Sequence, residues 1–150
     1  PGLRGAAPGA VAVAGAAVML GVTSNRELDT CHPKLQRLIR EVDKRLTKRK
    51  LMDLTVVCGH RGEGAQELAF AQHRSTKHWP DSRHNTLPSQ AVDVAPYPID
   101  WNDRESFALL AGYILAVADD LDIEVSVGAL WKKFPDLPHV ELTPRELNRP

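Results

Sequence analysis

The sequence predicts a single α+β domain, in which a small antiparallel sheet flanked by helices carries the candidate functional residues. Two long segments, which begin near Pro33 and near Asn102, repeat apolar residues at helical spacing. Between and after them lie short runs of strand-forming residues bounded by turns. A chain of 150 residues is long enough to bury one hydrophobic core. Helices and short strands in mixed order are typical of this class.

The N-terminal segment differs in composition from the rest of the chain. Residues 1–22 are rich in Gly, Ala and Val and carry one charge, Arg4. The apolar run 10–22 is shorter than the ~20 residues that span a bilayer, so it is either a signal or anchor segment or a flexible leader. We therefore expect a leader over residues 1–23 and a domain over 24–150, with membrane contact only if 10–22 is a signal or anchor.

The first long helix should begin at Pro33, which suits the first turn of a helix. It ends in the sequence KRLTKRK, residues 44–50, in which five of seven residues are basic. This basic end either contacts an anionic polymer or is a solvated helix end favoured by the helix dipole. Its buried face should consist of apolar residues at helical spacing: Leu35, Leu38, Ile39, Val42 and Leu46.

The elements that follow are shorter. LTVVC at 54–58 predicts a buried strand, a helix should run from about Glu63 to Gln72, and residues 73–90 form a long loop. In the strand AVDVA at 91–95, Asp93 should point away from the face of its neighbouring valines. The second long helix, capped by Asn102 or Asp103, presents an apolar stripe that belongs to the core. The last elements are strands at 123–127 and 139–142 and a capping box at 143–146.

Three of these residues are candidate metal ligands. His84 and Asp93 lie nine positions apart, and His139 lies far downstream. Imidazole, carboxylate and imidazole form a normal ligand set for a catalytic Zn²⁺, with the fourth position left to water. On spacing alone, the alternative is that His84 caps a loop and Asp93 starts a turn.

Three longer segments occur in a recognisable order: CGHRGEGAQ, then STKHWPDSRHNTLPSQAVDVAPYPIDW, then LWKKFPDLPHVEL. With their motifs S-x-H…A-V-D and D-x-x-H, they resemble the zinc D-alanyl-D-alanine carboxypeptidase family. The resemblance covers roughly Ser24 to Leu142 and is strongest to the phage branch, the L-alanyl-D-glutamate endopeptidases used as endolysins. Residues 127–131 depart from the family's Trp-Gly-Gly-Asp-Trp pattern and retain only Gly128 and Trp131.

The resemblance implies a fold of the hedgehog and D-Ala-D-Ala peptidase type, with zinc on the sheet. It implies that His84, Asp93 and His139 bind the metal. Asp136 matches the catalytic acid and base, and Arg61 matches an arginine that steadies negative charge near the metal. Ser82 and Gln66 match residues that bind substrate or support the site. The substrate implied is the stem peptide of peptidoglycan.

Several functional alternatives remain. The acid in D-x-x-H is Asp, whereas carboxypeptidase branches usually carry Glu, which favours cleavage of L-Ala–D-Glu over release of terminal D-Ala. A module of the same fold could instead bind the wall without catalysis. The balance of 19 basic and 19 acidic residues disfavours a nucleic-acid partner. We expect a monomer, made in the cytoplasm of a phage host, that acts at the cell wall. The two cysteines, Cys31 and Cys58, are interpreted as small buried residues.

Overall fold

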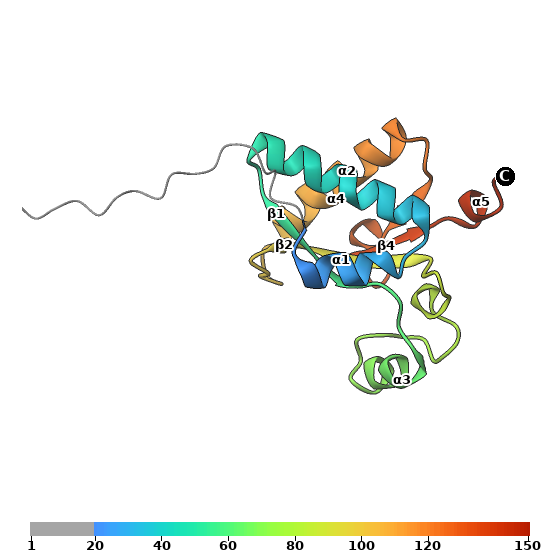
Figure 1. The fold of residues 1–150 in the computed structure, drawn as a ribbon. Coiled ribbons are helices and arrows are strands. Elements are labelled where there is room, and N and C mark those ends of the chain that lie inside the picture. The colour runs from blue at the N-terminus through green and yellow to red at the C-terminus, as the bar shows by residue number, and fades with distance from the viewer. Residues whose placement is uncertain (1–19) are drawn as a thin grey trace, which may run out of the picture.

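The computed structural model describes residues 20–150, and Figure 1 shows its fold. It confirms the predicted α+β class, with one four-stranded antiparallel sheet in the order β1-β2-β4-β3. The elements are α1 (Val22–Asp29), α2 (Pro33–Arg49), β1 (Asp53–Cys58), α3 (Glu63–Ala71), η1 (Arg83–Asn85), β2 (Ala91–Tyr97), α4 (Arg104–Asp120), β3 (Val125–Val127), η2 (Gly128–Leu130), β4 (His139–Leu142) and α5 (Pro144–Leu147).

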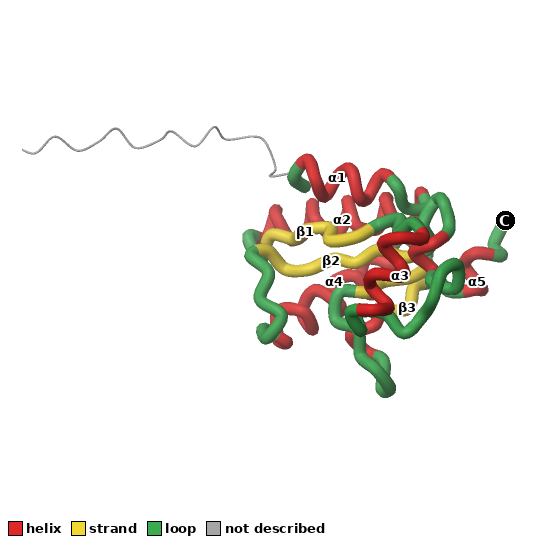
Figure 2. The backbone as a smooth tube through the Cα atoms, turned by 90° about the horizontal axis from the view of Figure 1, so that it is seen from below, coloured by secondary structure: helices red, strands yellow, loops and turns green. Residues whose placement is uncertain are grey.

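The two long helices cover one face of the sheet, and the other face carries the candidate site. Helices α2 and α4 pack against each other and against the strands, while α3 and the loop around η1 lie on the opposite side (Figures 1 and 2). Val92 and Val94 of β2 are 0% and 2% exposed and belong to the core that these helices close. Because neighbouring residues in a strand point to opposite faces, Asp93 points to the side of α3 and η1.

The predicted helix ends are confirmed in detail. The ring of His32 accepts a hydrogen bond from the backbone N–H of Lys34, so His32 caps the helix that Pro33 begins. At the other end, Lys50 adopts a left-handed conformation with φ 53° and stops α2. The side chain of Asp103 caps α4 by accepting from the backbone N–H of Ser106 at 3.0 Å.

Helix α1 was not predicted, and it lies along the outer edge of β1. Polar side chains of α1 and of its C-terminal cap accept hydrogen bonds from backbone N–H groups of β1 and of the two residues after it: Ser24 from Val56 at 3.0 Å, Glu27 from Gly59 at 3.0 Å and Thr30 from His60 at 2.7 Å. The helix therefore packs through these polar contacts and one buried apolar side chain, Leu28, rather than through an apolar stripe.

The expected leader falls almost entirely on residues 1–19, which lie outside the described part of the chain. Within the described part, Leu20 is 7% exposed and belongs to the core, and α1 begins at Val22. None of the helices between residues 20 and 150 is long and apolar enough to cross a membrane. The leader over 1–23 and the membrane role of 10–22 stay predictions.

Candidate metal centre

The site is built on a row of paired residues that crosses three strands. Asp93 of β2 pairs with His139 of β4 on one side and with Cys58 of β1 on the other. The pairing with Cys58 depends on a register shift between Val56 and Cys58. The fourth side chain, His84, comes from η1, which the loop 73–90 folds over this face of the sheet. Residues from four separate segments therefore meet at one point.

Three donor atoms form a nearly equilateral triangle. Nε2 of His84 and Oδ1 of Asp93 are 3.2 Å apart, and Nδ1 of His139 is 3.3 Å from each of them. A tetrahedral zinc ion lies about 2.0–2.1 Å from such donors, which places the donors about 3.3–3.4 Å from one another. The triangle therefore has the size of one face of a zinc coordination tetrahedron.

The hydrogen bonds of the two imidazoles direct their lone pairs into this triangle. Nδ1 of His84 lies 2.7 Å from the carbonyl oxygen of Gly59, and Nε2 of His139 lies 2.8 Å from Oε2 of Glu141. Because a carbonyl and a carboxylate only accept, both ring nitrogens must donate. In the neutral rings, the remaining nitrogens then carry lone pairs, and both face Asp93. Such outer partners typically fix the tautomer and orientation of metal-binding histidines.

The carboxylate of Asp93 supports the same conclusion. Asp93 is 9% exposed, and while both imidazoles are neutral in these tautomers, its Oδ1 has no hydrogen-bond donor among residues 20–150. A buried carboxylate oxygen without a partner is costly. Three acceptors that converge on one point can hold a cation between them, and two nitrogens and one oxygen form a donor set that fits zinc.

The pKa values of the metal-free site also favour positive charge between these side chains. Burial lowers the pKa of His84, but the hydrogen bond and negative charge of Asp93, with a further contribution from Cys58, outweigh burial and raise that pKa to about 10. For Asp93, burial raises the pKa, but hydrogen bonds from protonated His139 and His84 outweigh burial and lower it. For His139, burial lowers the pKa, but the hydrogen bond to Asp93 outweighs burial and raises it. Without a metal, protons on the imidazoles would supply the positive charge.

Asp136 stands at the rim of the triangle. Its Oδ2 lies 3.9 Å from Nδ1 of His139, and its side chain is 47% exposed. Backbone hydrogen bonds fix this loop, from Asp136 to Gly128 at 3.0 Å and from His139 to Asp136 at 3.2 Å. Partial burial raises the pKa of Asp136, and the charge of Asp93 raises it further. This is the position and the direction of shift that a group exchanging protons near a metal needs.

Arg61 and Gln66 lie together behind Asp93. Nη2 of Arg61 is 3.4 Å from Oδ2 of Asp93, and its Nη1 donates to Oε1 of Gln66 at 3.2 Å. Gln66 is fully buried and donates to Oγ of Ser75 and to the carbonyl of Lys77. Gln66 therefore holds Arg61 and the loop in place and offers no surface to a ligand.

Ser82 acts on the site through the backbone. Its Oγ accepts from the N–H of His84 at 3.3 Å, and its own N–H donates to Oδ1 of Asn85 at 2.9 Å. This capping box forms the single turn of η1 and fixes the direction of His84. Ser82 is 9% exposed, so its hydroxyl lies close to the site but is largely covered.

Two residues at the site had no place in the expected ligand set. Glu141 orients His139, and the alternation of a strand could have revealed it, because residues 139 and 141 of β4 share a face. Cys58 is half-buried, and its sulfur lies with donor atoms of His84 and Asp93 in a group within 4.8 Å. Cys58 is therefore less buried than expected, whereas Cys31 is buried as expected, at 1% exposure.

A buried set of imidazole and carboxylate donors beside a half-exposed carboxylate is the arrangement of metal-dependent hydrolases. The fold and the site together define this class. More particularly, the chain belongs to the phage L-alanyl-D-glutamate peptidase family, whose sequence profile matches residues 17–144. This confirms the resemblance to the phage branch.

A solved structure agrees with the family assignment. The crystal structure of the Serratia marcescens L-Ala D-Glu endopeptidase ChiX matches with a TM-score of 0.70 and 29% sequence identity, over 85% of this chain and 92% of that chain. Among curated proteins, no sequence matches the chain. Family and fold make the protein a peptidase that cleaves peptidoglycan.

Proposed function

We propose that the protein is a zinc-dependent endopeptidase that cleaves the bond between L-Ala and D-Glu in the stem peptide of peptidoglycan. One observation carries the proposal: the donor atoms of His84, Asp93 and His139 lie 3.2–3.3 Å apart with their lone pairs directed inward. The choice of bond is supported by the family and by the activity in the name of the Serratia protein. The Asp in D-x-x-H supports the same choice.

In this proposal, His84, Asp93 and His139 hold the metal. When bound, zinc polarises the scissile carbonyl and lowers the pKa of a coordinated water toward ~7. Gly59 and Glu141 keep the two imidazoles in the tautomers that the metal requires.

Asp136 moves the proton in the proposed mechanism. From the rim of the triangle it accepts a proton from the attacking water and returns it to the leaving amine of D-Glu. Its raised pKa suits both steps, because a carboxylate with an ordinary pKa would be a weaker base and would release the proton too readily.

Arg61 places a positive charge beside the metal ligands. Its guanidinium lies against Asp93 and is held by the buried Gln66. We assign to it the stabilisation of negative charge that develops on the oxygen of the scissile carbonyl. For Ser82 and Gln66 we propose positioning roles, toward His84 and Arg61 respectively, with Ser82 close enough to contact a bound peptide as well.

The proposal extends to the place of action. A peptidase of this family meets its substrate at the bacterial cell wall, and we propose synthesis in the host cytoplasm followed by passage to the wall. A monomer is sufficient, because all the proposed ligands and the proposed proton carrier come from one chain.

The decisive experiment is digestion of purified peptidoglycan followed by mass spectrometry of the new termini. The expected product is a stem peptide with a new N-terminal D-Glu, with small D-Ala-D-Ala peptides left intact. Free D-alanine as the main product would make the protein a carboxypeptidase instead. Elemental analysis should find about one zinc per chain, which His84→Ala should largely remove. Full retention of zinc in His84→Ala would refute the assigned ligand set.

A further inference from the structure

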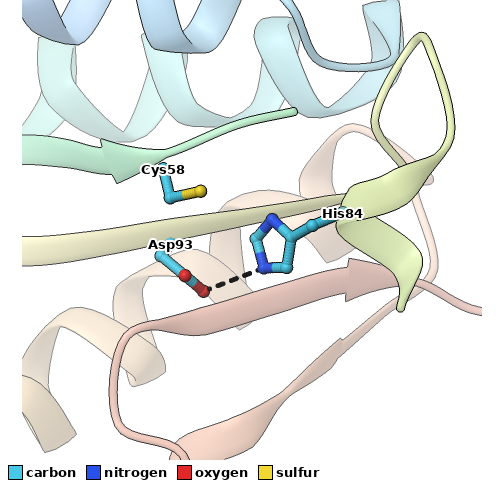
Figure 3. A group of neighbouring side chains, drawn as sticks. All are labelled: Cys58, His84 and Asp93. Atoms are coloured by element: carbon cyan, nitrogen blue, oxygen red, sulfur yellow. Dashed lines mark ion pairs between the residues drawn. The ribbon is translucent and has the colours of Figure 1, made fainter. Parts of the chain in front are cut away.

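Cys58 places a thiol beside the candidate metal centre. Its sulfur and one donor atom each from His84 and Asp93 all lie within 4.8 Å of one another. Figure 3 shows the three side chains, which come from β1, from η1 and from β2, with the ion pair between His84 and Asp93 dashed. The thiol is a fourth potential donor next to the His–Asp–His set.

The register shift in β1 is what brings Cys58 to this face. Val56 pairs with Val94, so regular pairing would place Val57 opposite Asp93 and turn Cys58 toward the core with Val92. The shift instead pairs Cys58 with Asp93 and leaves Val57 41% exposed. Bulges of this kind commonly re-aim a side chain next to an active site.

The surroundings of Cys58 connect it to the candidate centre. Nη2 of Arg61 lies 3.7 Å from its sulfur and 3.4 Å from Oδ2 of Asp93, so the thiol and the candidate ligand share one charged neighbour. Cys31 provides the contrast within the same chain. It is 1% exposed, its thiol faces the carbonyl oxygens of Glu27 and Ala91, and burial raises its pKa to about 12. Only Cys58 of the two cysteines is placed to bind a metal.

We propose that Cys58 is a further protein donor to the metal centre, and that its thiolate can take the coordination position left open by His84, Asp93 and His139. The inference rests on the metal centre of the proposed function. A second observation supports it: the buried Oδ1 of Asp93, the residue that Cys58 pairs with across the sheet, has no hydrogen-bond donor among residues 20–150 while both imidazoles are neutral.

The required movement is small. In a tetrahedral site with Zn–S about 2.3 Å and Zn–N about 2.0–2.1 Å, sulfur and nitrogen lie about 3.5 Å apart. From a separation of at most 4.8 Å, the sulfur must approach the donor atoms of His84 and Asp93 by no more than ~1.3 Å, which is within reach of a side-chain rotation. Four protein donors make a closed site of the structural type, whereas the open site keeps a place for water. The thiolate-bound state is therefore a resting state that an incoming substrate must displace.

Cobalt substitution tests the proposal without relying on activity. One equivalent of Co²⁺ added to the metal-free protein should give visible d–d bands together with a near-ultraviolet thiolate-to-cobalt charge-transfer band. Cys58→Ser should keep the d–d bands and lose the charge-transfer band. Cys31 is present in both proteins and serves as the internal control. Circular dichroism checks that the variant is folded.

The outcomes separate this proposal from the proposed function. Visible bands without a charge-transfer band, or a charge-transfer band that survives Cys58→Ser, would overturn the role of Cys58 and leave the His–Asp–His centre intact. The absence of all cobalt bands would overturn the metal centre itself, and the role of Cys58 with it. In the unaltered chain, one equivalent of Zn²⁺ should slow the reaction of Cys58 with a thiol reagent. An unchanged rate of that reaction would also overturn the proposal.

Discussion

Replacing Glu141 tests whether His139 serves a metal. The carboxylate accepts from Nε2 of His139 at 2.8 Å and is 21% exposed. Burial raises the pKa of Glu141, but the hydrogen bond and charge of His139 outweigh burial, so the net shift is downward and the carboxylate is ionised at neutral pH. Glu141→Gln keeps an acceptor and therefore the tautomer of His139, but removes the charge that makes the imidazole a stronger ligand.

Losing an outer partner of a metal ligand typically costs about 10–100-fold in metal affinity, or about 1.4–2.7 kcal/mol. Because Gln still accepts a hydrogen bond, we expect about 10-fold weaker zinc binding for Glu141→Gln and about 100-fold for Glu141→Ala. Competition with a chromophoric chelator measures both. Glu105→Gln, the same chemical change at an exposed position on α4, should bind zinc as the unaltered chain does. Unchanged zinc affinity in both Glu141 variants would refute the reasoning.

Three further predictions test the proton carrier Asp136, the close packing of Gly128 against Asp136 and His139, and the ion pairs of Glu146. Asp136→Asn should retain zinc and fold but lose ~10²-fold or more in turnover of purified peptidoglycan, and near-normal turnover would mean that another group moves the proton. Gly128→Ala places a Cβ against the carbonyl of Asp136 and 3.0 Å from Cβ of His139, and should lower the free energy of unfolding in urea by ~1–3 kcal/mol. Gly112→Ala, with no atom within 4 Å, should raise it by up to ~1 kcal/mol, so equal effects would contradict the packing argument. For Glu146, burial raises the pKa, but bonds from Lys34, the N–H of Glu124 and Arg149 lower it to about 2. This depressed pKa contributes stability that is present above the unfolded pKa of ~4.3 and is lost as pH falls toward 2. Glu146→Gln should therefore be less stable by ~1–3 kcal/mol at pH 7, and a deficit independent of pH would refute the assignment.

Whether a helix could be predicted from the sequence depended on whether it buries a regular stripe of apolar residues. Helices α2 and α4 bury apolar stripes against the sheet, and their periodicity was visible in the sequence. Helix α1 buries Ser24 against a strand edge and has only one fully buried apolar residue, Leu28. Periodicity of apolar residues does not detect such a helix, which is why the segment was not recognised.

The site was predictable to the extent that it depends on residue identity. The triplet His84, Asp93 and His139 was selected by residue type and strengthened by the resemblance, and the structure brings their donor atoms together, although the roles assigned to them stay proposals. Cys58 was out of reach because its direction depends on strand register. A shift of one residue in the strand pairing reverses the face to which a side chain points. No local pattern in the sequence of β1 indicates this shift.

The polar contacts of α1 also bear on self-association. In the order β1-β2-β4-β3, strand β1 is an outer strand, and its free N–H groups could pair with a strand of another molecule. Ser24, Glu27 and Thr30 occupy those N–H groups at Val56, Gly59 and His60. A chain shortened past α1 would lose these acceptors and expose a ready template for strand addition between copies. Helix α1 thus blocks strand addition at the β1 edge of the sheet, a property to be preserved in any shortened or fused form of the enzyme.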